Sequence, residues 1–418
     1  MAAVPVFSVV IPVFNKWELT ENCLRSLHEH SGECEYEVIV VDNGSSDETA
    51  SALQPLGEAL FGRRFSRLRF EENRNFGPAC NAGAGAATAA LVFFLNNDTL
   101  LTPGWAPPLL EALDGDASLG GVGPLLLYED GTVQHVGVVF SLYRVEHLYR
   151  GFPADHPAVR RTRHCRVLTA AALMLRRELF LRQGGFCEEY RNGFEDVDFC
   201  LHLGQSGQRL ACIPASVVCH LESRTAGRKN NEEDNAAVLN RRCGELFRTD
   251  KHQQGLKDGF LPFITDSFDI GLRLKEEAEE ALFRQAVGQP AHIWHQYCVE
   301  NPYWVRGREY LALVLEKGGY AAESLFLRAE VADILCLASA AKELMLAAER
   351  LGDEGMRAEA EADFRKLADS RQNRAHFRHA LDLNKKRGDR VIETLLDGKL
   401  REIRAERENG ESGVLRES

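Results

Sequence analysis

The sequence lacks any run of apolar residues long enough to cross a bilayer as a helix, which takes about 20 such residues. The N-terminal stretch Val4–Val13 is apolar but far shorter. It also lacks the preceding basic region and the following cleavage site of a secretory signal. We therefore expect Val4–Val13 to contain a first buried strand. The expected location is the cytoplasm, either free or held peripherally at the inner face of the membrane.

Paired cysteine motifs are absent as well. The eleven cysteines are scattered, no C-x-x-C pair occurs, and their total is odd. This pattern predicts neither a zinc ribbon nor a disulfide framework. Reduced thiols in a cytoplasm are the simplest interpretation.

An excess of positive charge is also missing, because 62 acidic residues outnumber 50 basic ones and the formal net charge is -12. A protein that holds nucleic acid by neutralising phosphates over its whole surface needs the opposite balance. We expect no nucleic-acid partner. With 44% hydrophobic and 27% charged residues over 418 positions, the chain has globular composition and room for two domains.

The first half alternates buried-strand runs with helical patterns, which predicts an α/β fold with a mostly parallel sheet and flanking helices. The expected strands are Phe7–Val13, Glu37–Val41 and Leu91–Leu95, and the expected helices are Trp17–His30, Asp47–Leu60 and Gly77–Ala89. In such sheets ligands bind beyond the carboxyl ends of the strands. The residues that follow the expected strands are all polar: Asn15, Asp42, Asn43, Asn96, Asn97 and Asp98.

Shorter strands are expected after about residue 120, at Gly120–Leu127, Thr132–Phe140 and Val167–Leu175. Between the last two lies a loop, Tyr143–Arg166, that is rich in arginine. We consider two interpretations of this loop. It closes over a diphosphate or binds an anionic lipid-linked acceptor, or it is a solvated flexible loop.

Strand signals stop near Gly255, and helix-forming residues dominate the rest of the chain. Helical spacing occurs at Ser267–Val287, Trp304–Glu316, Ala321–Arg350 and Met356–Leu367. We predict an α/β domain over residues 1–255, an all-helical domain over 256–400 that resembles a solenoid of helix pairs, and a charged, disordered tail over 401–418. Self-association or a protein partner is expected at the helices.

Two motifs in the first half are suited to contact a nucleotide. In V-V-D-N-G-S-S-D-E-T (Val40–Thr49), Asp42 ends a buried strand and can accept hydrogen bonds from a base or ribose, whereas Asp47 suits a helix cap. The cluster Asn73–Gly77, with Asn81, suits close approach to ribose or diphosphate. Taken alone, that cluster is more typical of a turn before an Ala/Gly-rich helix packed on the sheet.

Three further motifs carry groups suited to metal binding and acid–base chemistry. Asp98, in Leu95–Thr99, offers the hard oxygen ligand that Mg²⁺ or Mn²⁺ prefers. Glu195, Asp196 and Asp198 crowd one helix start, where either a general base or a helix cap is expected. His220, in the motif Val217–Ser223, taken alone is more often structural than a metal ligand.

Together these motifs, in this order over Val6–Leu246, resemble the family-2 glycosyltransferases, and within them the rhamnosyltransferase-like branch of bacterial polysaccharide assembly enzymes of the cell envelope. The resemblance implies a GT-A fold, which is Rossmann-like. It implies a nucleotide pocket lined by Pro12, Val13, Asn15, Asp42, Asn75, Gly77, Asn96 and Asn97, with Asn81 nearby.

The resemblance further implies a divalent cofactor, Mn²⁺ or Mg²⁺, held by Asp98 and His220. Asp196, or Glu195 beside it, is the implied general base, which leaves Asp198 as a helix cap. The family's D-x-D motif falls on Asn96, Asn97 and Asp98, so an amide replaces the first carboxylate. We expect weak metal binding without nucleotide.

The implied function is that of an inverting, hexosyl-transferring glycosyltransferase. Its donor is a UDP-, dTDP- or GDP-sugar, and its acceptor is a glycan or a lipid-linked sugar. One alternative is a catalytically inactive GT-A binding module with a helical docking scaffold. The other is a nucleotidyltransferase, although the stretch after the first strand, Pro12–Lys16, lacks that class's phosphate-binding glycines.

Overall fold

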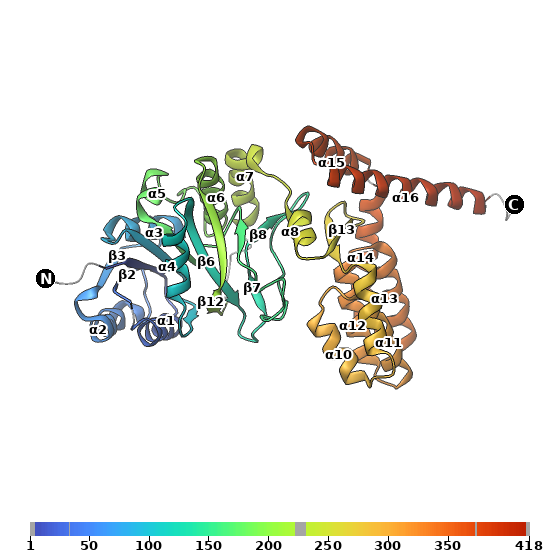
Figure 1. Cartoon of the computed structure of the whole chain (residues 1–418), viewed down its shortest axis with the longest axis horizontal. Helices are drawn as coiled ribbons and strands as arrows, with labels where there is room; N and C mark the ends of the chain where they lie inside the picture. The colour runs from blue at the N-terminus through green and yellow to red at the C-terminus, as the bar shows by residue number, and fades with distance from the viewer. Residues whose placement is uncertain (1–4, 33, 222–230, 373, 415–418) are drawn as a thin grey trace. The chain divides into compact units, whose positions relative to one another are not determined.

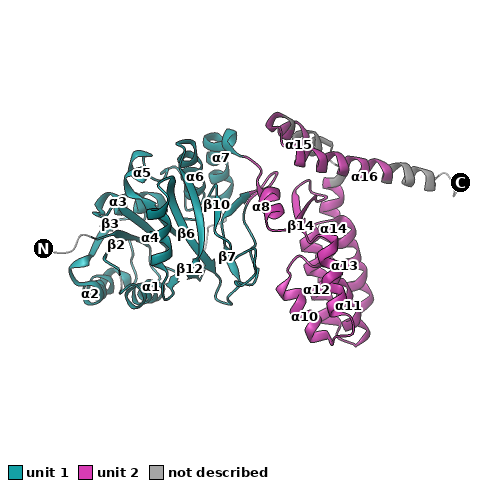
Figure 2. Ribbon diagram, viewed as in Figure 1, with its two compact units in different colours: residues 1–139, 146–247 teal, residues 140–145, 248–418 magenta. Residues whose placement is uncertain are grey.

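The computed structural model describes residues 5–32, 34–221, 231–372 and 374–414, and they form two compact units (Figure 2). Unit 1 consists of residues 1–139 and 146–247, and unit 2 of residues 140–145 and 248–418. The sequence placed the division after residue 255. It gave no sign that residues 140–145 pack with the C-terminal unit.

Unit 1 is built on a ten-stranded sheet of order β10-β12-β6-β11-β4-β1-β2-β3, with β5 beside β12 and β7 beside β6 (Figure 1). The strands are β1 (Phe7–Val13), β2 (Tyr36–Asn43), β3 (Phe65–Phe70), β4 (Leu91–Leu95), β5 (Thr99–Leu101), β6 (Leu119–Leu127), β7 (Val133–His135), β10 (Arg163–Cys165), β11 (Ala172–Arg176) and β12 (Arg209–His220). A separate ribbon pairs β8 (Val138–Phe140) with β9 (Val145–His147).

Parallel pairs join β1 to β2 and β4, β2 to β3, and β6 to β12, while β11 runs antiparallel to both β4 and β6. The helices of this unit are α1 (Trp17–His30), α2 (Thr49–Phe61), α3 (Phe76–Ala86), α4 (Ala106–Gly115), α5 (Arg177–Arg182), α6 (Glu195–Gln205) and α7 (Glu232–Cys243). Short 3₁₀ turns span Gly62–Arg64 and Gly244–Leu246. The predicted α/β class with a mostly parallel sheet is confirmed.

The centre of the sheet forms as its sequence predicts. All residues of β1 except Pro12 are fully buried, because helices cover both faces of this strand. On one face Gly83 of α3 lies so close to β1 that a Cβ at this position would meet Val10 Cγ1 at 2.3 Å. The Ala/Gly-rich helix therefore packs tightly on the sheet, as the plainer interpretation of its sequence expected.

Unit 2 contains a short hairpin followed by consecutive helices (Figure 1). Its elements are α8 (Lys251–Lys257), β13 (Leu261–Ile264), β14 (Ile270–Arg273), α9 (Glu276–Ala286), α10 (Ala291–Glu300), α11 (Val305–Lys317), α12 (Ala321–Leu335), α13 (Ala338–Leu351), α14 (Glu354–Gln372), α15 (Arg374–Arg387) and α16 (Arg390–Val414). The region is helical as predicted, but the hairpin corrects the expectation that strands end near Gly255. The segment expected to be helical over Ser267–Val287 is in part strand β14.

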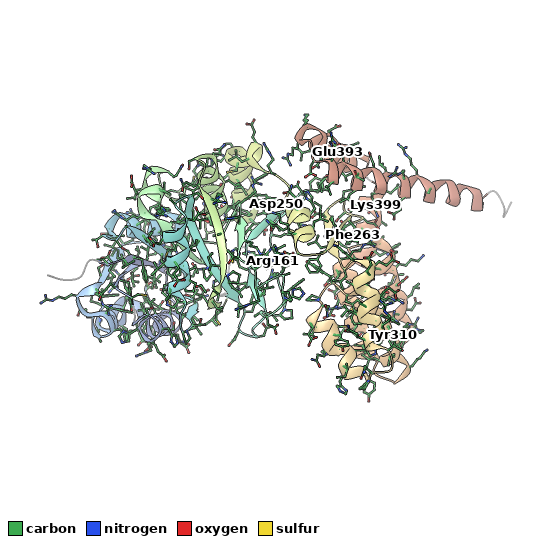
Figure 3. All side chains as sticks on the ribbon, viewed as in Figure 1. Arg161, Asp250, Phe263, Tyr310, Glu393 and Lys399 are labelled. Carbon is green, nitrogen blue, oxygen red and sulfur yellow. The ribbon has the colours of Figure 1, made fainter. Side chains whose placement is uncertain are left out.

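A disordered tail was expected from residue 401, whereas helix α16 runs from Arg390 to Val414. Near the start of this helix, Ile392 and Leu396 are fully buried. Lys399 on this helix (Figure 3) is buried and pairs with Asp266 at 2.6 Å. Leu415–Ser418 lie outside the described residues.

Two further sequence expectations concern the whole chain. All eleven cysteines are free thiols, and eight of them have a raised pKa because burial disfavours the thiolate. None of the helices in the described ranges is both long enough and apolar enough to span a membrane.

Candidate active site

A cavity of about 460 Å³ opens in unit 1 where β1, β2 and β4 end. We call it the cleft. Nine of the twelve predicted site residues line it: Pro12, Val13, Asn15, Asn96, Asn97, Asp98, Glu195, Asp196 and His220. The sheet therefore brings together residues that are more than two hundred positions apart in the chain.

Asp98 and His220 face each other on one side of the cleft. His220 Nε2 lies 3.1 Å from Asp98 Oδ1, and both residues are less than one-tenth exposed. The pairing of β5 with β12 fixes this arrangement, because Thr99 is in register with His220 and the Leu221 amide donates to the Asp98 carbonyl. One carboxylate oxygen and one imidazole nitrogen are ligands that fit Mn²⁺ or Mg²⁺, with substrate oxygens completing the coordination of the ion.

Asn96 and Asn97 complete this side of the cleft. Asn96 Nδ2 is 3.4 Å from His220 Nε2, while Asn97 donates to the Thr20 hydroxyl at 2.9 Å. Neither amide carries charge, so Asp98 supplies the negative charge next to His220.

Glu195 and Asp196 line the cleft from the start of α6. Phe194 precedes them in the left-handed region, with φ 72°, and turns the chain into the helix. Glu195 is buried and accepts from the Gly193 amide at 2.7 Å. Asp196 is half-buried and accepts from the amides of Ala170 at 3.0 Å and Val197 at 2.9 Å. Since each carboxylate oxygen has two lone pairs, Asp196 retains capacity for a further partner.

The segment Thr169–Ala171 connects the two sides of the cleft. Ala170 donates to Asp196, and the Ala171 carbonyl accepts from the Asn96 amide at 2.9 Å. The helix that carries the acidic pair is therefore tied by hydrogen bonds to the end of β4. All three residues of this segment also line the cleft.

Asp198 was expected to cap α6, but the structure gives it another role. Its side chain is buried, accepts from the Tyr190 hydroxyl at 2.8 Å and forms an ion pair with Arg242 of α7. Burial alone would raise the pKa of Asp198, but the hydrogen bonds from Arg242 and Tyr190 outweigh it and lower that pKa. Asp198 therefore joins α6 to α7 behind the cleft.

The loop after β1 is held by side chains from the following βα connection. Asn15 has φ 56°, and its side-chain oxygen accepts from the Ser46 amide at 2.8 Å. Asp47 accepts from the amide of Thr49 at 3.0 Å and from that of Trp17 at 3.1 Å. Asp47 thus accepts hydrogen bonds from the first residue of α2 and the first residue of α1, which agrees with the expected capping role.

Asp42 was expected to contact the nucleotide, and the structure places it elsewhere. It does not line the cleft, and its side chain is fully buried. One oxygen accepts from the Ser45 amide at 2.9 Å, and the other pairs with Arg67 and Arg69 of β3. Burial alone would raise the pKa of Asp42, but the bonds from Arg67 and Ser45 prevail and lower it.

The remaining two nucleotide residues, Asn75 and Gly77, also lie outside the lining of the cleft. The Asn75 carbonyl accepts from Asn43 Nδ2 at 2.9 Å, which supports the loop before α3. A Cβ at Gly77 would meet the Cys187 carbonyl at 3.3 Å, so this glycine permits close packing. Asn81 bonds both the amide and the carbonyl of Phe186, at 2.8 and 2.9 Å, and is structural.

Several residues that line the cleft were not expected there from the sequence. Phe14, which is 46% exposed, and Phe76 present aromatic rings to the cleft, and Lys16 adds a cation. Asn192 lines the cleft and accepts from the Phe76 amide at 2.8 Å. Only Phe14 and Lys16 carried a signal, since both follow β1 directly. Glu222 and Ser223, which end the histidine motif, lie outside the described residues.

The arginines of Tyr143–Arg166 do not line the cleft. Arg163 is buried and donates to the Ala158 carbonyl, Arg160 donates to the Pro214 carbonyl at 3.3 Å, and Arg150 lies 5.5 Å from the centre of the Tyr128 ring. Arg166 donates to the Leu246 carbonyl, and Arg144 pairs with Asp269 in unit 2. These five side chains thus have partners away from the cleft, which argues against closure of the loop over a diphosphate there. Binding of an anionic lipid-linked acceptor by the loop stays a prediction.

Comparison with known proteins adds independent evidence. Residues 8–180 match the family model described as Glycosyl transferase family 2. The chain is 30% identical over 234 residues to the O-antigen biosynthesis protein RfbC of Myxococcus xanthus, covering 52% of this chain and 17% of that protein. It is 26% identical over 246 residues to the N-acetylglucosaminyl-diphospho-decaprenol L-rhamnosyltransferase of Mycobacterium tuberculosis, covering 51% of this chain and 75% of that one.

Among solved structures, the chain is similar to GalNAc-T7 with UDP, GalNAc and Mn²⁺, with 16% identity, a TM-score of 0.48, and 58% of this chain and 48% of that one covered. The family-model match over residues 8–180 includes the motifs that follow β1, β2 and β4. The chain therefore carries a glycosyl transferase family 2 domain over residues 8–180.

Proposed function

We propose that unit 1 is an inverting glycosyltransferase that moves a hexosyl group from a nucleoside-diphosphate donor to an acceptor hydroxyl. The observation that carries this proposal is that Asp98, within the family-2 match over residues 8–180, shares one cleft with Asp196 and His220. A transfer of this kind needs a charge-stabilising site for the leaving group and a base for the incoming alcohol, both reachable from one bound donor.

The donor is a UDP-, dTDP- or GDP-sugar. Its nucleotide lies along Pro12, Val13 and Asn15 and along Asn96 and Asn97, all of which line the cleft. Asp42, Asn75 and Gly77 support this pocket from behind rather than touch the donor. Phe14 offers an exposed ring on which a base or sugar stacks.

A divalent cation, Mn²⁺ or Mg²⁺, fits at Asp98 and His220, because these residues offer a carboxylate oxygen and an imidazole nitrogen 3.1 Å apart. When bound, it supplies positive charge that stabilises the diphosphate leaving group. The chain's own part is to orient the diphosphate with Asn96 and Lys16, which both line the cleft.

Asp196 is the general base. It is half-buried, whereas Glu195 is 3% exposed and bonded to the Gly193 amide. Asp196 therefore has the better access to an acceptor hydroxyl. As Asp196 takes that proton, the acceptor oxygen attacks the anomeric carbon on the side opposite the departing diphosphate. This single displacement inverts the configuration without a covalent intermediate.

The acceptor is a glycan or lipid-linked sugar of a bacterial surface polysaccharide. Support comes from two relatives, whose names connect them with O-antigen biosynthesis and with a decaprenol-linked sugar. The aligned region is a small part of the first of these proteins, so the activity of the whole chain remains part of this proposal. Unit 2 is proposed to bind a protein partner or a second copy, and the protein to act in the cytoplasm or at the inner membrane face.

The test is slow donor hydrolysis, with water as acceptor, across a panel of UDP-, dTDP- and GDP-sugars with and without Mn²⁺. A glycosyltransferase releases nucleoside diphosphate and free sugar. Release of pyrophosphate would instead identify a nucleotidyltransferase, and binding without turnover of any donor would identify an inactive binding module.

A further inference from the structure

Gln134 lies behind the Asp98–His220 pair, at an irregularity of the sheet. In the pairing of β6 with β7, Leu126 is opposite His135 and Leu127 is opposite Val133, so Gln134 is the extra residue of a β-bulge. A bulge redirects a side chain that regular pairing would place elsewhere. Gln134 is 6% exposed, and a buried amide requires partners.

Both ends of the Gln134 amide bond to the same residue. Its oxygen lies 2.6 Å from His220 Nδ1, and its nitrogen donates to the His220 carbonyl at 3.2 Å. A carbonyl can only accept, so the NH₂ end of the amide must face it. The amide oxygen therefore faces the ring, and since it too can only accept, Nδ1 carries the hydrogen.

This arrangement decides what the other ring nitrogen presents to the cleft. In a neutral ring with hydrogen on Nδ1, Nε2 carries a lone pair, and this lone pair faces Asp98 Oδ1 at 3.1 Å. Two acceptor atoms that face each other are stabilised by a cation between them. The opposite tautomer would place a hydrogen on Nε2 and prevent ligation.

We propose that Gln134 is a positioning residue that holds His220 in the tautomer and orientation that bind the divalent cation. This inference rests on the metal-assisted transfer proposed above. The bulge gives Gln134 its orientation, and its two bonds fix both the ring and the backbone at the end of β12. Partners of this kind contribute about 10- to 100-fold to metal affinity.

A pair of substitutions separates tautomer control from simple space filling. Gln134→Met keeps the length of the side chain but removes the acceptor, so it leaves the tautomer unset. Gln134→Glu keeps an acceptor for Nδ1 and adds negative charge, although it loses the donor to the carbonyl. Gln183→Met, at an exposed position after α5, is the matched control.

Two readouts are taken on the full chain at about pH 8, where an ordinary histidine is neutral. The first is the affinity for Mn²⁺ alone, measured by electron paramagnetic resonance. The second is the ¹⁵N spectrum of the His220 ring in metal-free protein, assigned by comparison with His220→Gln. We expect the hydrogen on Nδ1 in the wild type and in Gln134→Glu, and a mixture of tautomers in Gln134→Met.

Gln134→Met should weaken Mn²⁺ binding about 10- to 100-fold, while Gln134→Glu and Gln183→Met bind at least as tightly as the wild type. Equal Mn²⁺ affinity in Gln134→Met and wild type would overturn the inference. So would a wild-type His220 ring with its hydrogen on Nε2, or a wild-type protein that does not bind Mn²⁺. Failure of the proposed function alone is distinguishable, because donor turnover would be absent while these Mn²⁺ and ¹⁵N results still hold.

Discussion

Asp42, near the end of β2, and Asp98, shortly after β4, were both expected to contact a ligand, but the fold gives them different surroundings. Asp42 faces two arginines of β3 and is closed off from the cleft. Asp98 faces a histidine and lines the cleft. The difference comes from the neighbouring strand, which is β3 for Asp42 and β12 for Asp98. We therefore expect a substitution of Asp98 to affect binding and a substitution of Asp42 to affect stability.

Asp98→Asn should remove metal-dependent donor binding and leave folding intact. The substitution keeps the shape of the side chain, but Asn96 and Asn97 are already neutral, so it removes the charge that balances a cation at His220. Calorimetric titration with UDP, dTDP and GDP should show Mn²⁺-enhanced binding of at least one nucleotide to the wild type. The same enhancement in Asp98→Asn would contradict a metal site at this residue.

Asp42→Asn should instead lower stability, by about 3 kcal/mol near neutral pH, because it leaves the largely buried Arg67 and the more exposed Arg69 without their buried carboxylate partner. The folded-state pKa of Asp42 is lowered from 3.8. Its stabilising contribution is therefore complete above the unfolded-state pKa and is lost as pH falls through the folded-state value.

Urea unfolding at several pH values measures this effect. The gap between wild type and Asp42→Asn should be constant above about pH 5 and shrink as the pH falls below the unfolded pKa of about 3.9. Asp114→Asn, at an exposed position on α4, should show no such gap. A gap that widens in acid would show that Asp42 is not held as a carboxylate.

At the scale of elements, α3 offers a matched pair of glycines that tests its packing on the sheet. A Cβ at Gly83 would lie 2.3 Å from Val10 Cγ1, whereas Gly85 is exposed with nothing within 4 Å. Gly83→Ala should therefore destabilise the protein by about 1–3 kcal/mol through overpacking. Gly85→Ala should stabilise it by about 0.5–1 kcal/mol, because alanine loses less backbone entropy in a helix.

Thermal and urea unfolding of the two variants give the comparison directly. Equal and small effects of Gly83→Ala and Gly85→Ala would mean that α3 does not lie against β1 as described. The pair shares one helix, so a general change in helix propensity cannot produce opposite signs.

Elements with a clear hydrophobic pattern were predictable, and those shaped by tertiary contacts were not. The bounds of β1, β4 and α1 agree with the sequence, because continuous apolar runs and helical spacing are strong local signals. Strand β3 was missed because Arg67 and Arg69 interrupt it, and both are paired with Asp42 in the fold. The break between α12 and α13, where Cys336 has φ 48°, has no glycine or proline to mark it.

The site shows the same division. Asp98, Asp196 and His220 could be expected at one cleft because each lies at or near the start or end of an element that the sequence indicates, and all three line it. Gln134 was not predictable, since its position depends on a bulge in β7 and not on any local pattern. Phe76 and Asn192 were missed because contacts between α3 and the loop before α6 place them at the cleft.

At the scale of the whole molecule, one segment from the first half of the chain belongs to unit 2. Residues 140–145 belong to unit 2, where the Phe140 amide donates to Asp250 at 2.7 Å and the Leu142 amide donates to Asp269 at 3.0 Å. A fragment that ends at Phe247 loses both acceptors. Because these two hydrogen bonds are lost, we expect the segment to open in the fragment.

Limited trypsin digestion tests this expectation at Arg144. Cleavage there should be at least about tenfold faster in the fragment than in the full chain, since local opening governs proteolysis. Cleavage at exposed Arg182 provides the control and should be the same in both, provided that the fragment retains its circular dichroism spectrum. Equal protection of Arg144 would show that unit 1 holds the segment by itself.

Donor turnover by Asp196→Asn is the most direct test of the proposed chemistry of the cleft. We predict that its release of nucleoside diphosphate from the best donor falls by about 10²- to 10⁴-fold, as expected for loss of a general base, while nucleotide affinity measured by calorimetry stays unchanged. Glu195→Gln is the comparison at the neighbouring residue, and it should lower the release of nucleoside diphosphate by a smaller factor. Full turnover by Asp196→Asn with intact binding would contradict the proposed role of this cleft.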